Sequence, residues 1–357
     1  MLRDKLKACG ANFCDSCLGG AVRDFGDVAK ELSYIRNSAA VCDFSFLPKY
    51  SLNEECGAEF LDSVLPANML KLRYGKMADT FLASPGGEVL AEVLAANIDG
   101  RIFLLAESAR ADADFSGIFN GEGTDFKDIT KDYCVLSFDG PSSWRLAESV
   151  FGTDALNLSY MSVEMYEFGG EPVCLMRGGK TGEFGYQAMI ESRKAGELFD
   201  CLKEGAENLG GGLAGMKAHS LARLQGNFFN VAAEGKAVKN PLELGLQWMV
   251  DFSKDSFIGA DKILGDRSRG VARALAAVDS ETPLSVGAKL YFGGRAVGEI
   301  VVAEEISGRG LALGLFERDF AYAGFDYSLS PNGGDDVRTV SRPTLLSRSL
   351  TEGMGAE

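Results

Sequence analysis

The sequence predicts an α+β protein, in which a body of antiparallel β-hairpins and helices precedes a small all-β module. Two observations support this fold class. Up to about residue 275, apolar β-type runs flank glycine-containing turns, and stretches with helical spacing of apolar residues lie between them. Beyond that point the pattern is β throughout, which indicates a second unit of the fold.

Three segments of the body are predicted to be hairpins. They are residues 81–90 about Pro85-Gly86-Gly87, residues 95–104 about Asp99-Gly100, and residues 163–176 about Gly169-Gly170. The Asp-Gly pair fits a type I′ turn, whose two central residues need positive φ. Residues 133–138 are expected to form a strand, and residues 142–150 and 195–208 are expected to form helices.

The C-terminal module is predicted from a further set of short strands. They are two strands in residues 290–302 about Gly293-Gly294, one in residues 311–316 and one in residues 322–329. Residues 264–274 are expected to link this module to the body. The tail beyond Pro343 is expected to be frayed.

Composition and charge exclude several classes of protein. The 357 residues are 46% hydrophobic and 24% charged, as in ordinary soluble globular proteins. A net charge of −15 argues against binding to nucleic acid, which needs clustered Lys and Arg, and does not favour anionic membranes. No apolar run approaches about 18 residues, and no signal peptide is visible, so a cytoplasmic location is expected.

Cysteine spacing leaves a metal role open. Cys9, Cys14 and Cys17 have the C-x4-C-x2-C spacing of plant-type iron–sulfur proteins. The fourth ligand of such a cluster would have to be Cys42 or Cys56. A zinc or redox role for these thiols is a second alternative. The expectation is nevertheless that the eight cysteines are reduced, unremarkable thiols and that no metal is bound.

The chain contains one histidine, His219. Histidine-rich metal sites are therefore impossible, and a Ser-His-Asp triad could use this residue alone. Its neighbours suggest a partly apolar helix, where a structural role is expected. Chemistry would then depend on carboxylates, Arg, Lys, Tyr or a bound cofactor.

Residues 177–186 are the most informative segment. Four glycines surround one acid, Glu183, directly after the β-type run of residues 173–176. Glycine tolerates positive φ and permits close approach of a backbone to a ligand. A sharp turn that presents one carboxylate suits a flat, nitrogen-rich ligand, and the alternative is a plain hairpin turn with solvated charges.

Four segments, in order, carry a resemblance to a known family. They are residues 41–46 with Asp43 and Ser45, followed by 57–61 and Asn68; residues 75–87; residues 177–186; and residues 241–248 with Lys254, Phe257, Ile258 and Gly259. They resemble the folate-binding aminomethyltransferases, the T-protein of the glycine cleavage system and its relatives. In the third segment Lys180 stands where the family has a tyrosine.

The resemblance implies a three-lobed cloverleaf of the T-protein type, with tetrahydrofolate in a central hole and a small C-terminal β-barrel. The implied division is an N-terminal extension over residues 1–34, a folate-binding region of two intertwined lobes over residues 35–263, and a barrel domain over residues 275–343.

The resemblance also implies cofactor-binding residues. Glu183 matches the acid that holds the pterin ring, since a carboxylate can accept two hydrogen bonds from the ring's amino group and adjacent N–H. Arg177 and Tyr186 of the same motif are expected to help to bind tetrahydrofolate.

A basic residue on the following helix is expected to assist. Arg223 precedes Leu224-Gln225 as an arginine precedes Leu-Glu in relatives, and it is preferred over Lys217 and His219. The alternative is that Arg223 is a solvated helix residue.

The departures from the family affect the chemistry. Where transferring relatives have two adjacent aspartates, this chain has Leu90 and Ala91, which can neither move a proton nor stabilise a cation. Glu92, which would share the face of Leu90 by strand alternation, and Asp79 are weaker catalytic candidates. Residues 304–309 also lack the Thr-Ser-Gly of typical members.

The function expected from this resemblance is tetrahydrofolate-dependent one-carbon transfer of the aminomethyltransferase type, with the usual aspartate replaced. The donor would be a small one-carbon compound or a lipoylated carrier protein. One alternative is a non-catalytic folate-binding protein in assembly or regulation. The others are a folate-dependent demethylase acting on another small donor and an unrelated ligand.

Overall fold

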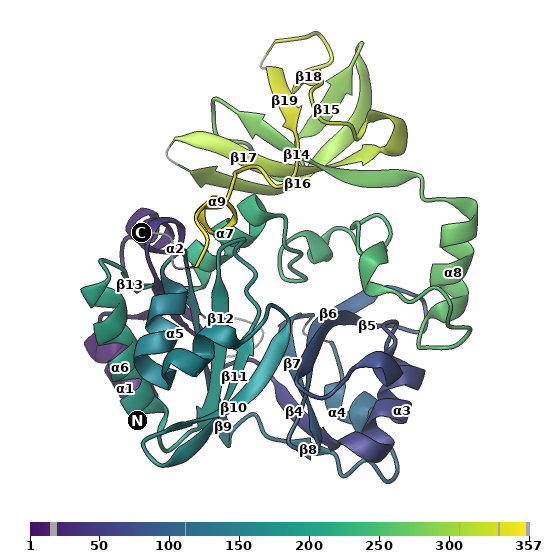
Figure 1. Ribbon diagram of the computed structural model, residues 1–357. Helices are drawn as coiled ribbons and strands as arrows, with labels where there is room; N and C mark the ends of the chain where they lie inside the picture. The colour runs from purple at the N-terminus through teal and green to yellow at the C-terminus, as the bar shows by residue number, and fades with distance from the viewer. Residues whose placement is uncertain (15–19, 111, 307, 335, 355–357) are drawn as a thin grey trace.

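The computed structural model describes residues 1–14, 20–110, 112–306, 308–334 and 336–354. In this part of the chain an 11-stranded, mostly antiparallel sheet curls through two lower lobes, and a closed β-barrel forms a third lobe above them (Figure 1). The predicted three-lobed arrangement of the T-protein type is therefore correct.

The large sheet takes its strands from distant parts of the chain. Their order is β13 (Gly212–Leu213), β3 (Ala40–Asp43), β9 (Tyr133–Asp139), β12 (Gly185–Glu191), β11 (Glu171–Arg177), β10 (Ser162–Phe168), β5 (Lys76–Ala83), β6 (Val89–Ile98), β7 (Arg101–Ala109), β4 (Lys49–Asn53) and β8 (Lys127–Asp128). Antiparallel β1 (Asn12–Phe13) and β2 (Val22–Asp24) form a separate pair.

The helices cover this sheet and link it to the barrel. They are α1 (Leu2–Ala8), α2 (Val28–Asn37), α3 (Glu54–Val64), α4 (Phe115–Phe119), α5 (Ser143–Phe151), α6 (Ala195–Asn208), α7 (Met216–Gly226), α8 (Ala260–Arg269) and α9 (Arg348–Thr351). None of the helices in the described residues is both long and apolar enough to cross a membrane.

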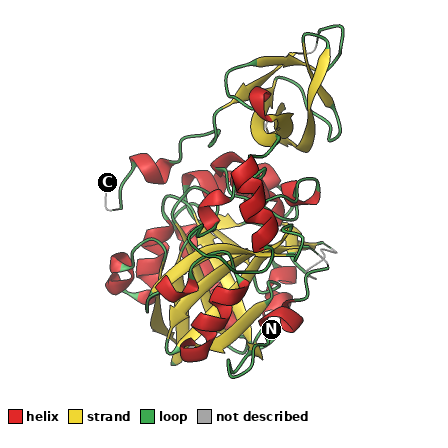
Figure 2. Ribbon diagram, turned by 90° about the vertical axis from the view of Figure 1, so that its right-hand side faces the viewer, coloured by secondary structure: helices red, strands yellow, loops and turns green. Residues whose placement is uncertain are grey.

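The barrel is a separate lobe that packs on the body through shared hydrophobic residues such as Leu224 of α7 and Leu313 of the barrel (Figure 2). Its strands are, in order, β14 (Arg273–Ser280), β17 (Arg309–Glu317), β16 (Arg295–Ile306), β15 (Lys289–Phe292), β18 (Asp326–Ser328) and β19 (Asp336–Val340). The expected linker over residues 264–274 is helical as far as the end of α8. The strand expected over residues 322–329 is shorter, since only β18 pairs there.

The three predicted hairpins are present in the body. Asp99 and Gly100 have φ of 53° and 67°, as a type I′ turn requires, and Gly169 and Gly170 have φ of 58° and 81°. The predicted helices correspond to α5 and α6 within one residue at each end.

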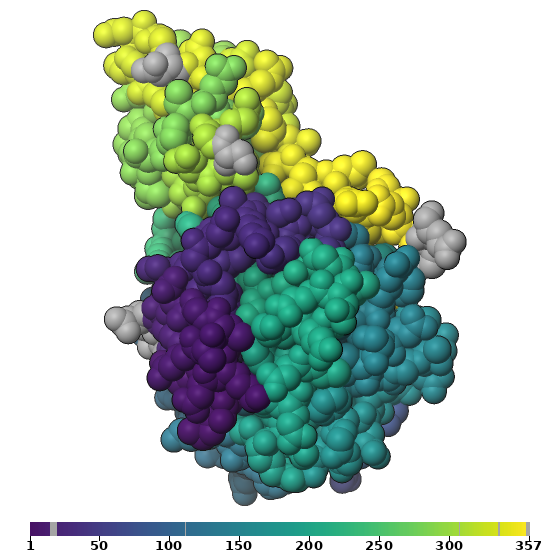
Figure 3. Space-filling view, turned by 90° about the vertical axis from the view of Figure 1, so that its left-hand side faces the viewer, coloured from purple at the N-terminus to yellow at the C-terminus, as the bar shows by residue number. Residues whose placement is uncertain are grey.

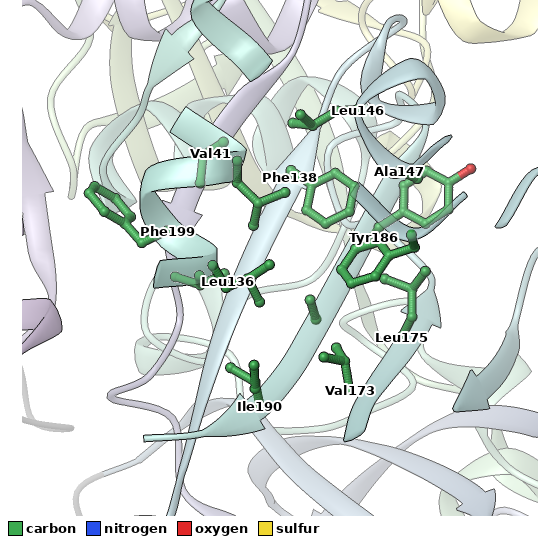
Figure 4. Close-up of a cluster of buried hydrophobic side chains, with 14 of the residues drawn as sticks. Val41, Leu136, Phe138, Leu146, Ala147, Val173, Leu175, Tyr186, Ile190 and Phe199 are labelled. Atoms are coloured by element: carbon green, nitrogen blue, oxygen red, sulfur yellow. The ribbon is translucent and has the colours of Figure 1, made fainter. Parts of the chain in front are cut away.

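Three hydrophobic cores support the lower lobes of the described chain, and one of them packs α2 and α7 against strands of the sheet. In the first, α1, α5 and α6 cover β9, β11 and β12, and the rings of Phe138 and Tyr186 stack at 5.2 Å with 9° between their planes (Figure 4). Leu2, Leu6 and Val22 belong to this core, so the first residues of the chain pack with the body. In another, α3 and α4 pack against β4, β6 and β7.

The barrel core gives a first prediction. Phe316 is fully buried and its ring lies 4.9 Å from that of Tyr327, so Phe316→Ala should lower the free energy of unfolding by about 3–5 kcal/mol through lost burial and a cavity. Phe292 of the same barrel is 50% exposed, so Phe292→Ala should cost about 1 kcal/mol or less. Urea unfolding measures both, and equal losses would contradict this packing.

Candidate functional site

The turn between β11 and β12 is packed on a buried acid at the end of β9, Asp139. A side-chain carbon on Gly179 or Gly185 would lie 2.7 or 2.6 Å from Asp139 Oδ1, so the turn needs glycine at both positions. Burial raises the pKa of Asp139 to about 7, and its carboxylate accepts a hydrogen bond from Thr181 (3.3 Å). The glycines thus bring the turn onto the sheet, with Lys180 pointing inward.

The ammonium of Lys180 lies among three buried carboxylates. Its Nζ is 2.5 Å from Asp79 Oδ1, 3.3 Å from Glu107 Oε2 and 3.4 Å from Glu92 Oε1. Arg223 of α7 enters from another side, with Nη2 2.5 Å from Glu92 Oε2. These five side chains, each less than a tenth exposed, are called the Lys180 cluster below.

A β-bulge places Glu107 in the cluster. In the ladder between β6 and β7, Glu92 and Val93 pair with Ser108 and Ala106, which leaves Glu107 as an extra residue. A bulge of this kind re-aims a side chain relative to strict alternation. Glu107 and Glu92 therefore both reach Lys180, although they belong to different strands.

A second bulge corrects an expectation for Leu90. Leu82 pairs with Ala91 and Ala83 pairs with Val89, so Leu90 is an extra residue of β6. Its side chain packs in the same hydrophobic core as Ala91. The expectation that Leu90 and Glu92 share one face of the strand is therefore wrong, because alternation is interrupted between them.

Burial and the neighbouring charges shift the pKa values of Glu92 and Glu107 in opposite directions. Burial favours the neutral form of Glu92, but Arg223 and Lys180 hold its pKa below the ordinary value. Burial raises the pKa of Glu107, and the neighbouring ammonium of Lys180 opposes this only in part. The pKa of Glu92 is thus lowered and that of Glu107 raised, although both carboxylates contact the same ammonium.

Buried polar atoms beside the cluster lack hydrogen-bond partners among the described residues. The side-chain amide N–H of Gln187 donates a hydrogen bond to Glu107 Oε1 (2.6 Å), but Gln187 Oε1 receives no hydrogen bond. Arg223 Nε likewise has no acceptor. Leaving such a group unpaired costs about 1–3 kcal/mol. These atoms indicate a place where a polar ligand or water belongs.

An exposed aromatic ring lies near the cluster. Tyr160 is 62% exposed, and desolvation of its hydroxyl together with the charge of Asp79 raises its pKa.

Glu183 points away from the cluster and binds the chain's own C-terminal segment. Its Oε2 accepts hydrogen bonds from the Ser349 N–H (2.9 Å) and hydroxyl (2.7 Å), and its Oε1 from the Arg348 N–H (3.3 Å). Arg36 Nη1 lies 3.5 Å from Oε1, and Ser349 Oγ accepts the N–H of Phe184 (2.9 Å). Glu183 therefore has partners from α2 and α9.

The C-terminal segment crosses from the barrel onto the body (Figure 3). The Thr344 N–H bonds to the carbonyl of Gln225 (2.9 Å), and buried Ser347 lies against Gly182 of the turn. The expectation of a frayed tail is wrong for residues 344–354, because a buried carboxylate supplies acceptors that a sequence pattern does not reveal.

Arg177 and Tyr186 also lie outside the cluster. Arg177 donates to the carbonyl of Leu158 (2.5 Å) and contacts Met354 Sδ (3.0 Å). Tyr186 is in the first core, on the opposite face of β12 from Gln187 (Figure 4). Of the residues expected from sequence, the structure thus brings together Asp79, Glu92 and Arg223, and it separates these from Glu183, Arg177 and Tyr186.

Sequence reasoning missed Glu107, Gln187 and the inward role of Lys180. A signal existed for Glu107, which is a lone charge in the otherwise apolar end of β7, as Glu92 is in β6. A charge in such a strand is buried and needs a partner. No comparable signal existed for Gln187.

The histidine lies at a buried position of a helix, which is consistent with the expected structural role. His219 of α7 is buried with its ring 4.9 Å from that of Phe44, and burial lowers its pKa to about 3.

Of the cysteines, Cys17 lies outside the described residues. Cys42 is buried in β3 and Cys56 is exposed on α3, in the other lower lobe. Within the described ranges, no group of three or more His, Cys, Asp or Glu side chains could hold a metal ion.

Comparison with known proteins agrees with this fold. The crystal structure of glycine cleavage system aminomethyltransferase T from Bartonella henselae superposes with a TM-score of 0.82 at 20% identity, over 96% of each chain. The architecture is therefore that of the T-protein class.

Sequence comparison then gives the family. An aminomethyltransferase of Thermotoga neapolitana is 24% identical over 262 residues, 71% of each chain, and one of Mycobacterium leprae is 28% identical over 281 residues, 77% of this chain and 75% of that protein. The profile of the GCVT N-terminal domain matches residues 2–254. The chain belongs to this family.

The Lys180 cluster generates a stability prediction. Lys180→Met should lower the free energy of unfolding by about 3–5 kcal/mol near pH 8, because buried carboxylates lose their cation. Without that cation the folded-state pKa of Glu107, which burial already raises, should lie still further above its unfolded value. The folded state then binds more protons than the unfolded chain, so part of the loss should return as the pH falls toward about 5.

The matched control is Lys203→Met on α6, where the lysine pairs with Glu207 (2.8 Å) at the surface. It should change stability by less than about 0.5 kcal/mol. Urea unfolding of both variants across this pH range is the measurement, and a pH-independent loss in Lys180→Met would contradict the cluster's charge balance.

The docked C-terminal segment generates a third prediction. Ser349→Ala removes the acceptor of the Phe184 N–H, so hydrogen exchange of that amide should accelerate about fivefold to tenfold. Thr351→Ala is the control on the same segment, since its hydroxyl bonds only to the Arg348 carbonyl (3.0 Å). Unchanged exchange at Phe184 in Ser349→Ala would show that this segment does not hold the turn.

Proposed function

We propose that this chain binds tetrahydrofolate against the Lys180 cluster and transfers a one-carbon unit to or from it. The observation that carries the proposal is the pair of buried, unpaired atoms Gln187 Oε1 and Arg223 Nε beside charged side chains. They lie where strands of both lower lobes and α7 meet. Membership of the GCVT family supports the same ligand.

The polar groups present fit a pterin ring. Such a ring offers N–H donors on one edge and a carbonyl and ring nitrogens as acceptors. Gln187 Oε1 can accept a hydrogen bond from the N–H groups, and Arg223 Nε can donate one to the carbonyl or to a ring nitrogen. We therefore assign the pterin contacts to Gln187 and Arg223, and we assign Glu183 to holding the docked C-terminal segment on the turn.

Reduced folate, when bound, supplies a nucleophilic nitrogen that carries the one-carbon unit. The protein's contribution is to position it and to manage charge and protons. Glu107, whose pKa is raised, is suited to hold and deliver a proton, whereas ionised Glu92 is suited to stabilise positive charge. Together they would replace the acid missing at Leu90 and Ala91.

A second candidate is binding of tetrahydrofolate without transfer, in assembly or regulation. The specific observation in its favour is that Leu90 and Ala91 pack in a hydrophobic core instead of offering a carboxylate. For the transferring candidate the donor would be a small one-carbon compound or a lipoylated carrier protein, since curated relatives are named aminomethyltransferases.

Calorimetric titration with tetrahydrofolate tests the shared premise and the placement of the site. Gln187→Ala should weaken binding about tenfold or more, since a buried acceptor is lost, whereas Glu183→Ala should change it less than about threefold. A larger loss of affinity in Glu183→Ala than in Gln187→Ala would instead indicate that Glu183 binds the pterin ring. Absence of binding at about 100 μM in the unaltered protein would contradict both candidates.

Transfer of labelled carbon from aminomethylated lipoyl carrier protein or methylated small donors separates enzyme from binder. Glu107→Gln should lower kcat at least about a hundredfold with tetrahydrofolate affinity reduced much less, and should remove the pH dependence due to this acid. Glu164→Gln on exposed β10 is the control and should have no effect. Binding without turnover from every donor would favour the second candidate.

A further inference from the structure

A cavity of about 450 Å³ lies between α8, the loop over residues 242–252 and the barrel. None of the Lys180 cluster residues lines it, so it is separate from the proposed folate site. Its volume is in the range of small-molecule sites. We infer that this cavity binds a small organic anion through Arg267, Arg318 and Arg342.

Charge is the first argument for this assignment. Arg267, Arg318 and Arg342 line the cavity and form no ion pair with any residue that the structure describes. They belong to α8, the start of a 3-10 turn after β17, and the segment after β19. Arg267 and Arg318 are exposed and Arg342 is part-buried near the carboxylate of Glu234, so an anion in the cavity would further compensate the charge of these guanidinium groups.

The acids at the cavity wall do not supply this compensation. Glu243 is held by Arg273 through two contacts, 2.9 and 3.1 Å, and Asp266 is held by Lys262 (2.7 Å) and Arg269 (2.8 Å). Each carboxylate is therefore neutralised by a cation other than the three arginines. Arg267, Arg318 and Arg342 therefore remain available to an anion in the cavity.

An unpaired donor is the second, independent argument. Arg342 Nε is a buried atom with no hydrogen-bond partner among the described residues. A guanidinium N–H left in this state loses a charge-assisted hydrogen bond that a carboxylate or phosphate oxygen would restore. The Arg267 guanidinium lies 3.5 Å above the Phe252 ring, which limits where this side chain can move.

The lining also selects the body of the ligand. Leu244, Val271, Ala274 and Leu275 supply an apolar wall next to the arginines. An inorganic ion would leave that wall in contact with water, whereas a short hydrocarbon or ring would cover it. The expected class is a monoanionic or dianionic compound with a small apolar body, joined to a phosphate or a carboxylate.

Isothermal titration of the full chain with phenyl phosphate and with benzoate tests the inference and distinguishes the two anionic groups. At least one probe should bind at one site per chain, with a dissociation constant below about 1 mM. Benzyl alcohol, which has the ring without charge, should not bind. Inorganic phosphate should bind more weakly than phenyl phosphate.

Variants locate the site. Arg267→Gln, at an exposed position, and Arg342→Gln should each weaken the probe at least about tenfold. Arg338→Gln is the control, since this barrel arginine pairs with Asp326 (3.1 Å) at the surface, and it should leave affinity unchanged. Gln187→Ala should also leave it unchanged, which keeps this test independent of the folate proposal.

Three results would overturn the inference. The first is no saturable binding of either charged probe up to about 10 mM. The second is an equal loss in Arg338→Gln and Arg342→Gln, which would indicate general charge attraction. The third is a loss in Gln187→Ala equal to that in Arg342→Gln, which would place the probe at the Lys180 cluster.

Discussion

The buried ammonium of Lys180 is the constraint on which the centre of this molecule depends. A lysine that is almost fully buried remains charged only if carboxylates come to it, because the cost of removing its hydration is large. Here three strands, β5, β6 and β7, each bring one acid, and α7 brings Arg223 to balance them. The relative positions of the two lower lobes and of α7 are therefore coupled to one side chain in a turn.

The polar residues of that turn contact three different parts of the molecule. Lys180 points inward, Thr181 rests on Asp139, and Glu183 receives the C-terminal segment and Arg36. Glycine at positions 179 and 185 makes this possible, because any side chain there would displace the Asp139 carboxylate. The position of the ammonium is consequently linked through the turn to the last residues of the chain.

The chemistry offered to a ligand follows from the same arrangement. Positions 90 and 91 carry Leu and Ala, and one of the three acids that face the centre, Glu107, comes from a bulge in the next strand. Because Arg223 and Lys180 lower the pKa of Glu92 while burial raises that of Glu107, the two acids are suited to different roles. This difference is why the proposed chemistry is assigned to Glu107.

Local sequence determined much of the fold: the Asp99-Gly100 turn, the helices α5 and α6, the β character of the C-terminal module and the motifs of the family. Each depends on residues close in the chain, where φ preferences and periodicity act. Sequence also pointed to Glu92 and Arg223, but their contact joins residues 131 positions apart, and Gln187 meets Glu107 across 80 positions. Only the tertiary structure decided those contacts, because bulges and strand order set which side chains face the centre, and neither is encoded in local periodicity.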